Sequence, residues 1–271
     1  MSEFARPRKA LGQNFLEDNN VIRKIVSSLH LSADDVVLEI GPGRGALTEL
    51  LLEQCAQLHV VEFDKDLIEY WQSRAIKQVS GRARLVVHGS DILDFDLDKV
   101  FCATQKPIKT IGNLPYNVSS PVLFRLSAYA ERISRQVVML QKEVVDRLIS
   151  SPGNKQYGRL SVMMQQRYSL ERQFNVSPKS FNPPPKVDSA VVAMTPLSSS
   201  TYQLGSELDF SNIVKQAFSM RRKTLRNNLK GIMESQLIEE LGIDPSARAE
   251  TLDVEQFVAL SNRYTLLLET A

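Results

Sequence analysis

Short apolar segments alternate with longer segments of helical periodicity through the first part of the chain. Five runs rich in β-branched residues predict buried strands at residues 36–40, 58–61, 85–88, 108–112 and 137–140. The stretches between them, such as 47–52 and 67–75, are compatible with helices. Strands that alternate with helices form parallel sheets covered on both faces, so the pattern predicts an α/β domain with a mostly parallel sheet.

The pattern changes towards the C-terminus. Segments near 172–176 and 187–195, on either side of a proline block, predict an antiparallel hairpin at the sheet edge. Residues 197–205 are mostly small and polar, which is typical of a linker. Apolar residues then recur at helical spacing, and 253–268 suits a final helix. We therefore expect an α/β domain over residues 1–200 and a small all-α domain over 201–271.

Composition narrows the class of protein without naming a partner. The chain has 271 residues, 43% hydrophobic and 24% charged, with a formal net charge of +2, as in an ordinary soluble globular protein. Its two cysteines have neither metal-site nor disulfide-framework spacing. No run approaches the ~18 apolar residues of a membrane span, and the N-terminus lacks the apolar core of a signal peptide. We expect no metal, no membrane partner and a cytoplasmic location.

Four candidate binding residues follow successive predicted strands. Gly41 lies in a glycine-rich turn after the first strand, and Glu62, Asp91 and Asn113 follow the next three. The carboxyl ends of parallel strands face one crevice, where ligands of such sheets bind. Glu62 lies about 20 residues beyond the glycines, a position suited to ribose hydroxyls. The G-x-G-x-G spacing differs from that of dinucleotide sites, which favours a nucleoside ligand without a pyrophosphate and argues against a nicotinamide oxidoreductase.

The tetrapeptide Asn113-Leu114-Pro115-Tyr116 can hold an exocyclic amine. The Asn113 side-chain oxygen and the Leu114 carbonyl can each accept one N–H. Pro115 has no N–H and a fixed φ, which sets the direction of that carbonyl. Tyr116 offers a flat face on which a base can stack. The alternative is an ordinary turn with a tyrosine packed beneath it.

Basic residues concentrate in two places. Arg6, Arg8 and Lys9 form an N-terminal arm. Five more are predicted on one helix, with no acidic residue between 211 and 231 to neutralise them: Arg221, Arg222, Lys223, Arg226 and Lys230. Arg222, Arg226 and Lys230 are four residues apart and would share a helix face. The pattern favours contact with phosphates over a merely solvated face.

Several motifs together resemble the ribosomal RNA adenine dimethylase family, specifically its small-subunit branch. The resemblance covers nearly the whole chain. It lies in Gly12–Leu16, the glycine turn 39–43, residues 113–116, 141–144, 157–161 and 181–189, and the segments 221–226 and 242–245. One departure is Arg44, where an apolar residue is expected. The resemblance implies a Rossmann-like methyltransferase domain over residues 1–200 and a helical RNA-recognition domain over 201–271.

The resemblance also implies roles for individual residues. S-adenosylmethionine would be the cofactor, bound by Asn14, Leu16, Gly41, Glu62, Asp91 and Asn113. Asn113, Leu114, Tyr116 and Phe181 would hold the target adenine, with Phe181 stacking opposite Tyr116 unless it only anchors the proline turn. The basic C-terminal residues would contact RNA. The implied reaction is dimethylation at N6 of two adjacent adenosines in a hairpin loop near the 3′ end of 16S rRNA. The implied partner is the small ribosomal subunit or its late precursor, and the enzyme would be monomeric.

Two alternatives stay open from the sequence. The protein could act chiefly as a binding factor in ribosome assembly or transcription, with methylation secondary. It could also methylate large-subunit RNA, as macrolide-resistance enzymes do. The intact Asn113–Tyr116 motif with Glu62 and Asp91 favours an enzyme, and the segments 181–189 and 221–226 favour the small-subunit branch.

Overall fold

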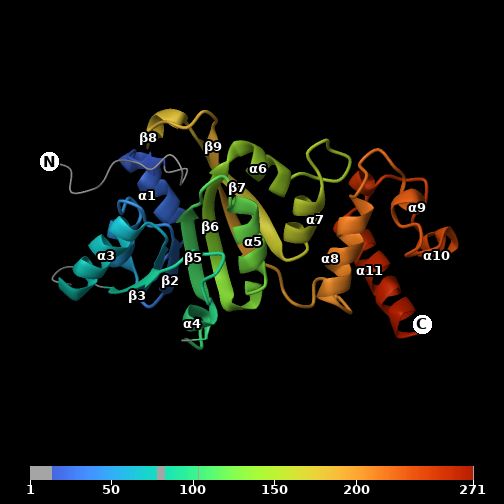
Figure 1. Ribbon diagram of the computed structural model, residues 1–271, viewed down its shortest axis with the longest axis horizontal. Helices are drawn as coiled ribbons and strands as arrows, with labels where there is room; N and C mark the ends of the chain where they lie inside the picture. Colours follow the sequence, from blue (N-terminus) through green and yellow to red (C-terminus); the bar gives the residue numbers. More distant parts are fainter. Residues whose placement is uncertain (1–13, 78–82, 103, 271) are drawn as a thin grey trace. The chain divides into compact units, whose positions relative to one another are not determined.

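The computed structural model describes residues 14–77, 83–102 and 104–270. Its centre is a seven-stranded sheet in the order β4-β3-β2-β5-β6-β9-β7 (Figure 1). The neighbouring pairs from β4 to β6 are parallel, and β9 joins β6 in antiparallel orientation. The strands are β2 (Val36–Ile40), β3 (Gln57–Glu62), β4 (Arg84–Gly89), β5 (Ile108–Asn113), β6 (Ile133–Gln141), β7 (Tyr168–Val176) and β9 (Ser189–Pro196). The predicted mostly parallel sheet with an antiparallel edge is confirmed.

A second, very short sheet fastens the start of the described chain. Strand β1 (Phe15–Leu16) pairs antiparallel with β8 (Phe181–Asn182), with Leu16 opposite Phe181. Side chains add two ties: Asn182 donates to Glu17 at 3.0 Å, and Ser180 donates to Asp18 at 3.2 Å. Residues far apart in sequence are therefore held side by side.

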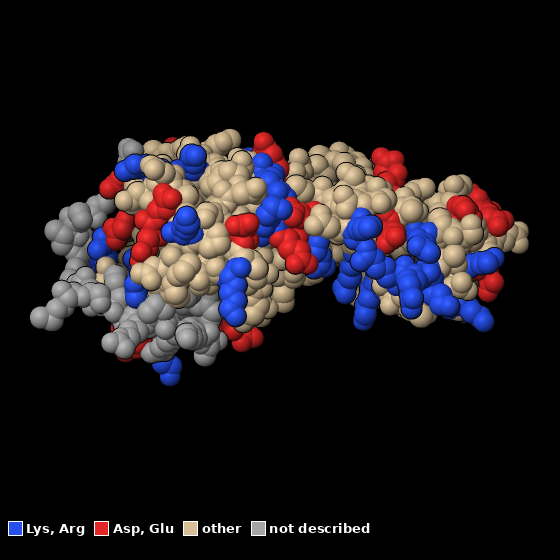
Figure 2. All heavy atoms as spheres, turned by 90° about the horizontal axis from the view of Figure 1, so that it is seen from above, with Lys and Arg blue, Asp and Glu red and all other residues tan. Residues whose placement is uncertain are grey.

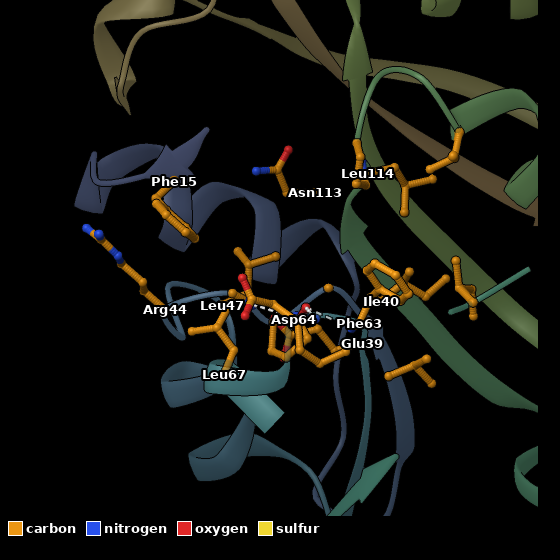
Figure 3. A pocket seen from close by; sticks show the side chains of 18 of the residues that line it. Phe15, Glu39, Ile40, Arg44, Leu47, Phe63, Asp64, Leu67, Asn113 and Leu114 are labelled. Atoms are coloured by element: carbon orange, nitrogen blue, oxygen red, sulfur yellow. Dashed lines mark hydrogen bonds between the residues drawn. The ribbon is translucent and has the colours of Figure 1, made fainter. Parts of the chain in front are cut away.

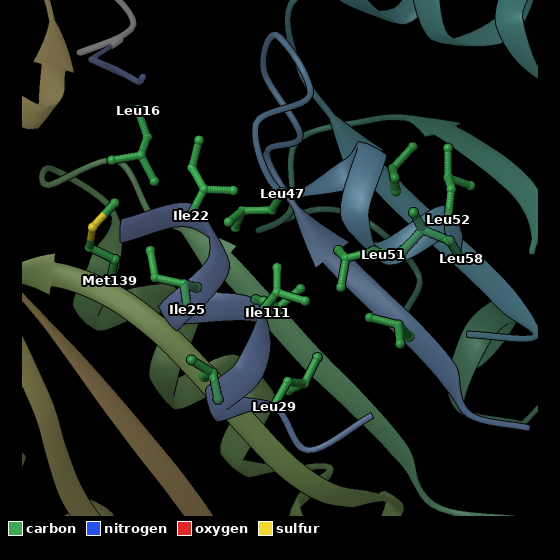
Figure 4. Close-up of a cluster of buried hydrophobic side chains, with 14 of the residues drawn as sticks. Leu16, Ile22, Ile25, Leu29, Leu47, Leu51, Leu52, Leu58, Ile111 and Met139 are labelled. Atoms are coloured by element: carbon green, nitrogen blue, oxygen red, sulfur yellow. The ribbon is translucent and has the colours of Figure 1, made fainter. Parts of the chain in front are cut away.

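Helices bury apolar stripes against the sheet. Ile25 of α1, Leu51 of α2, Ile111 and Met139 belong to one buried cluster (Figure 4). Trp71 of α3 belongs to the same cluster. Alternate strand residues such as Leu38 and Leu140 are also buried, so both faces of the sheet are covered, as the period of two in a strand requires. The helices here are α1 (Asn19–Ser28), α2 (Thr48–Gln54), α3 (Lys65–Lys77), α4 (Asp98–Phe101), α5 (Ser119–Ser127), α6 (Lys142–Leu148) and the 3-10 turns η2 (Ala130–Arg132) and η3 (Pro178–Ser180).

Contacts divide the chain into two compact units. The first contains residues 1–145 and 170–196, and the second contains 146–169 and 197–271. The break at Pro196 lies close to the predicted boundary near residue 200. Residues 146–169 were assigned to the first domain by sequence, yet Tyr157 and Val162 belong to the core of the helical unit with Phe210 and Phe257.

The helical unit contains α7 (Arg159–Gln165), α8 (Glu207–Ala217), α9 (Leu225–Asn228), α10 (Ser235–Glu240), η4 (Ala249–Thr251) and α11 (Val254–Glu269). The predicted final helix is confirmed as α11. The prediction that a single helix carries all five basic residues is wrong. Arg221, Arg222 and Lys223 lie in turns between α8 and α9, Arg226 lies in the four-residue α9, and Lys230 follows it.

Candidate functional site

A pocket of about 240 Å³ opens where strands β2 to β5 end. Figure 3 shows Asn113 and Leu114 on one side of it and Glu39 and Asp64 on the other. Parallel register explains the convergence, because Ile40 pairs with Val61 and with Gly112, so these strands end at one level. The pocket is lined by all the residues predicted from strand ends and from the resemblance on the cofactor side: Asn14, Leu16, Gly41, Glu62, Asp91 and Asn113.

The glycine turn shapes the wall after β2. Gly41 has φ +67°, and a Cβ built on it would meet no described atom within 4 Å, so the wall is open to a ligand there. Gly45 has φ +90°, and a Cβ there would lie 2.7 Å from the Trp71 ring. Glycine is required at both positions, for the left-handed backbone at Gly41 and additionally for close packing at Gly45.

Glu62 joins the end of β3 to the glycine turn. Its Oε1 accepts the N–H groups of Phe63 and Asp64 at 2.8 and 2.9 Å, and its Oε2 accepts the N–H of Gly43 at 3.2 Å. Burial raises the pKa of this carboxyl, although the three backbone hydrogen bonds oppose the shift. The carboxylate is thus held in one orientation at the pocket wall, and the remaining acceptor site on Oε2 can accept a hydroxyl hydrogen.

A second acid, Glu39, lies under the pocket and was not predicted as a site residue. It is only 1% exposed, and its Oε2 has no hydrogen-bond partner among the described residues. Burial raises the pKa of the Glu39 carboxyl to about 8, and the charges of Glu62 and Glu49 act in the same direction. The only signal in the sequence is its position at the head of the glycine motif, since its burial depends on packing between distant segments.

Asp91 and the residues around it complete the opposite end of the pocket. Asp91 and Ile92 line it beside the exposed ring of Phe63, which is 57% exposed. The Asp91 carboxylate accepts the N–H of Leu93 at 2.8 Å, which fixes its orientation. An acceptor beside apolar side chains is an environment suited to a purine ring with an exocyclic amine. Asp64 and Phe63 line the pocket too, and neither was predicted from sequence.

Asn113 is oriented by the N-terminal segment of the described chain. Its Nδ2 donates to the Asn14 carbonyl at 3.2 Å, so its donor end is used and its Oδ1 is left as an acceptor. Leu114 is buried and donates its N–H to Met139, and Pro115 has no N–H. The geometry therefore provides the Asn113 Oδ1 as an acceptor at this edge of the pocket, which suits an amine ligand.

The two predicted aromatic residues have different environments. Tyr116 is half-buried, lines the pocket and shares a 2.7 Å hydrogen bond between its hydroxyl and that of Ser189. Phe181 is 5% exposed and belongs to the hydrophobic cluster with Leu16 and Val176. Phe181 is not among the described side chains that line the pocket, whereas Tyr116 is.

The predicted basic residues form an exposed patch on the helical unit. Figure 2 shows lysine and arginine side chains gathered on one face there. All five are exposed: Arg221, Arg222, Lys223, Arg226 and Lys230. Arg221 is tied within the unit, donating to Glu250 at 3.1 Å and to the Lys155 carbonyl. The predicted N-terminal arm, Arg6 to Lys9, lies outside the described residues.

Arg44, the departure from the family pattern in the glycine turn, lies with its guanidinium carbon 4.3 Å from the centre of the Phe15 ring.

Metal ligands and membrane helices are absent from the described part of the chain. Among residues 14–77, 83–102 and 104–270, no group of three or more His, Cys, Asp or Glu side chains is placed to hold a metal ion. Within the same ranges, no helix has the length and apolar character that crossing a membrane requires.

Comparison with known proteins identifies the family. Residues 5–266 match the ribosomal RNA adenine dimethylase family. The ribosomal RNA small subunit methyltransferase A of Laribacter hongkongensis is 49% identical over 258 residues, 95% of this chain and 96% of the relative. That of Chromobacterium violaceum is 47% identical over 256 residues, 94% of this chain and 95% of the relative.

Solved structures of related proteins have the same fold as this chain. A dimethyladenosine transferase from Plasmodium falciparum superposes with a TM-score of 0.79 at 26% identity, covering 93% of this chain and 98% of that one. The 23S rRNA methyltransferase ErmE has the same fold, with a TM-score of 0.69 at 23% identity, covering 93% of this chain and all of that one. The predictions of a Rossmann-like methyltransferase fold and of S-adenosylmethionine as cofactor are confirmed. The chain belongs to the ribosomal RNA adenine dimethylase family.

Proposed function

We propose that this protein dimethylates N6 of two adjacent adenosines in a hairpin loop near the 3′ end of 16S rRNA, within the small ribosomal subunit or its late precursor. The relatives from Laribacter hongkongensis and Chromobacterium violaceum carry the small subunit in their names and span nearly the whole chain. A cytoplasmic location and a monomeric enzyme are part of the same proposal.

One observation carries the chemistry: the amide of Asn113 donates to the Asn14 carbonyl, which leaves Oδ1 as an acceptor at the pocket edge. The lone pair of an adenine N6 is delocalised into the ring and is a poor nucleophile. With Oδ1 of Asn113 accepting one N–H and the Leu114 carbonyl the other, the amine hydrogens are drawn out of the ring plane. The lone pair then localises towards the methyl donor, and fixed orientation lowers the barrier further.

The pocket fits the cofactor of the family. Gly41 leaves space at the wall, Glu62 presents an oriented carboxylate for a ribose hydroxyl, and Asp91 offers an acceptor for the adenine amine. Asp64 and Asp91 add acidic side chains to the lining, which suits a ligand carrying positive charge. S-adenosylmethionine supplies an electrophilic methyl group on a sulfonium. The residues of the chain bind and orient the two reactants, and the amine proton leaves to solvent.

The basic patch gives the enzyme an RNA-binding surface. Arg222, Lys223, Arg226 and Lys230 are exposed, and we assign them to phosphate contacts. Arg221 makes its ion pair with Glu250 while remaining 62% exposed, so it can also approach a phosphate. Because the target base must be unpaired or flipped to reach Asn113, binding through the backbone of the RNA is compatible with the reaction.

The decisive experiment incubates small ribosomal subunits lacking these methyl groups with the protein and radioactive S-adenosylmethionine, and then maps the label in the RNA. The expected label lies on two adjacent adenosines of one 16S hairpin loop. Large ribosomal subunits serve as the matched control. Label in the large subunit alone would assign the enzyme to the other branch, and tight subunit binding without label would favour a binding factor.

A further inference from the structure

Residues 181–189 are linked to the amine site at both of their ends, through β1 at the first and directly through Ser189 at the second. At the first end, Phe181 and Asn182 form β8 and hold β1, the strand that directly follows Asn14. At the other end, Ser189 begins β9 and shares its hydroxyl hydrogen bond with Tyr116. Asn113, at the end of β5, and Tyr116, three residues later, are therefore each held through a different end of the same distant segment.

The first anchor acts on the amide of Asn113. The Asn14 carbonyl that accepts from Asn113 lies one residue before β1. Backbone pairing of β1 with β8 fixes this carbonyl, and the Glu17 N–H adds a 2.9 Å bond to the Ser180 carbonyl. Without such anchoring the Asn113 amide could rotate and present its donor end to the target amine, which would repel it.

The second anchor acts on the ring of Tyr116. Ser189 is fully buried and lies opposite Gln141 in the antiparallel pair of β9 with β6. Next to it, the Lys142 N–H donates to the Asp188 carbonyl at 2.9 Å, so the hydroxyl of Ser189 has a fixed position. A hydrogen bond at the tip of the phenol restricts the tilt of the ring, and a stacking surface depends on that tilt.

We propose that residues 181–189, which we name the brace, position Asn113 and Tyr116 for the methyl transfer, with Ser189 and Asn182 as positioning residues. The inference rests on the proposed function. The middle of the brace is exposed at Lys186 and Val187, so RNA that reaches the pocket can contact it without disturbing the two anchors. Neither Ser189 nor Asn182 lines the pocket among its described residues, so each acts through its partner.

The test at Ser189 is a double-mutant cycle with Ser189→Ala and Tyr116→Phe. Each single variant should lower the single-turnover rate on small subunits at saturating cofactor by about tenfold, which the loss of one neutral hydrogen bond produces. The double variant should be no slower than either. Ser189→Thr, which keeps the hydroxyl, should recover most of the rate. Ser127→Ala is the matched control, because Ser127 is a buried serine of α5 whose hydroxyl donates to the Phe124 carbonyl.

A second readout does not need activity. In the wild type, burial raises the pKa of the Tyr116 phenol and the Ser189 hydrogen bond lowers it. Carbon-13 NMR of labelled tyrosines should therefore show a higher Tyr116 pKa in Ser189→Ala and no change in Ser127→Ala. An unchanged pKa would overturn the hydrogen bond between Tyr116 and Ser189, whether or not the wild type methylates RNA.

The test at the first anchor is Ser180→Ala/Asn182→Ala, which removes the Asn182 tie of β8 to Glu17 and the Ser180 tie of the adjoining turn η3 to Asp18. Its methylation rate should fall severalfold at saturating cofactor, while Asn175→Ala, an exposed asparagine of β7, should keep the wild-type rate. Wild-type rates in this variant or in Ser189→Ala would overturn the brace. Absence of methylation by the wild-type protein would instead contradict the proposed function.

Discussion

At the scale of single residues, Asn113 has the most demanding role, because its amide must present oxygen to the target. Asn113→Ala should reduce the single-turnover rate by about two orders of magnitude or more, as loss of one preorganised polar group does elsewhere. RNA binding should be unchanged. Rapid-quench assays with Asn175→Ala as control measure this, and a rate within a few-fold of the wild type would exclude Asn113 from the chemistry.

Glu62 carries the ribose end of the cofactor site. Glu62→Ala should weaken S-adenosylmethionine binding by roughly 1.5–3 kcal/mol, because a hydrogen bond to a charged acceptor is removed. Calorimetry without RNA measures the affinity. Glu69→Ala, an exposed acid of α3, is the matched control. Equal affinity in Glu62→Ala and the wild type would remove Glu62 from the site.

Glu39 gives the cofactor-free protein a distinctive pH dependence. Its folded pKa of about 8 exceeds the ordinary 4.5, so the folded state holds one more proton between these values. This stabilisation is complete below pH 4.5 and is lost as pH rises towards 8, at about 1.4 kcal/mol per pH unit. Denaturant unfolding should show that Glu39→Gln loses less stability than the wild type between pH 6 and 8. If stability falls equally with pH in Glu39→Gln and the wild type, the raised pKa of Glu39 is contradicted.

Site residues were predicted correctly from the sequence where their position at the end of a strand determines their place in the pocket. Glu62 and Asn113 end strands and Gly41 and Asp91 closely follow strands, and parallel register brings these strand ends together. Glu39 was not predicted because its burial and its unpaired oxygen arise only from tertiary packing. The placement of Phe181 in a core cluster likewise depends on the pairing of β1 with β8, which no local pattern indicates.

At the scale of elements, the strands were predicted within a few residues, whereas the basic helix was not. A tertiary contact accounts for the turns between α8 and α9, where a continuous basic helix was predicted. The buried Asn228 side chain donates to the carbonyls of Ala217 and Met220, which satisfies the end of α8 and the turn after it. Like charges four residues apart on a helix repel one another, which destabilises a continuous helix here relative to turns.

The basic patch should nevertheless bind RNA. Arg222→Ala or Arg226→Ala should weaken RNA binding and reduce the slope of log K against log salt by about 0.7–0.9 for each phosphate that is no longer neutralised. Cofactor affinity should not change. Arg263→Ala, whose side chain pairs with Glu240 in the same unit, is the control. Salt slopes equal to the wild type would make the patch a merely solvated surface.

Strands β3 and β4 share a histidine pair, in which His59 is buried and His88 is half-buried. Nδ1 of His59 and Nε2 of His88 are 3.0 Å apart, and Gln57 contacts the other nitrogen of His59 at 2.7 Å. Burial lowers the pKa of His59 to about 4, with the charges of His88 and Arg84 acting in the same direction.

This pair should make acid unfolding steeper. The unfolded state binds the proton first, so stability from His59 is complete above about pH 6.5 and is lost as pH falls towards 4. Thermal unfolding from pH 7 to 4.5 should show a steeper loss in the wild type than in His59→Asn. His30→Asn, a histidine outside the pair, should follow the wild type. Equal steepness in all three proteins would contradict a buried, neutral His59.

At the scale of the whole molecule, the class of fold and the order of elements followed from the sequence, but the exact division of the chain did not. Residues 146–169 leave the first unit because Tyr157 and Val162 complete the core of the helical unit. Composition indicates a linker near Pro196. Residues 146–169 belong to the helical unit although no linker-like composition flanks them, so composition could not reveal this assignment. The position of β9 between β6 and β7 is also a tertiary outcome.

The number of methyl groups is a property of the complete enzyme. After the first transfer only one N–H remains, so a site that required two hydrogen bonds would stop. Asn113 is neutral, and losing one hydrogen bond there costs about 0.5–1.5 kcal/mol without stranding a buried charge. Tyr116 can still hold the ring, so the monomethylated base can turn its methyl group aside and react again.

Mass spectrometry of nucleosides from fully reacted small-subunit RNA measures the product of this site. With excess S-adenosylmethionine, the digest should contain N6,N6-dimethyladenosine, about two for each 16S molecule as two adjacent targets require, with N6-methyladenosine appearing only transiently. A plateau at N6-methyladenosine, without the dimethylated nucleoside, would contradict dimethylation by this enzyme.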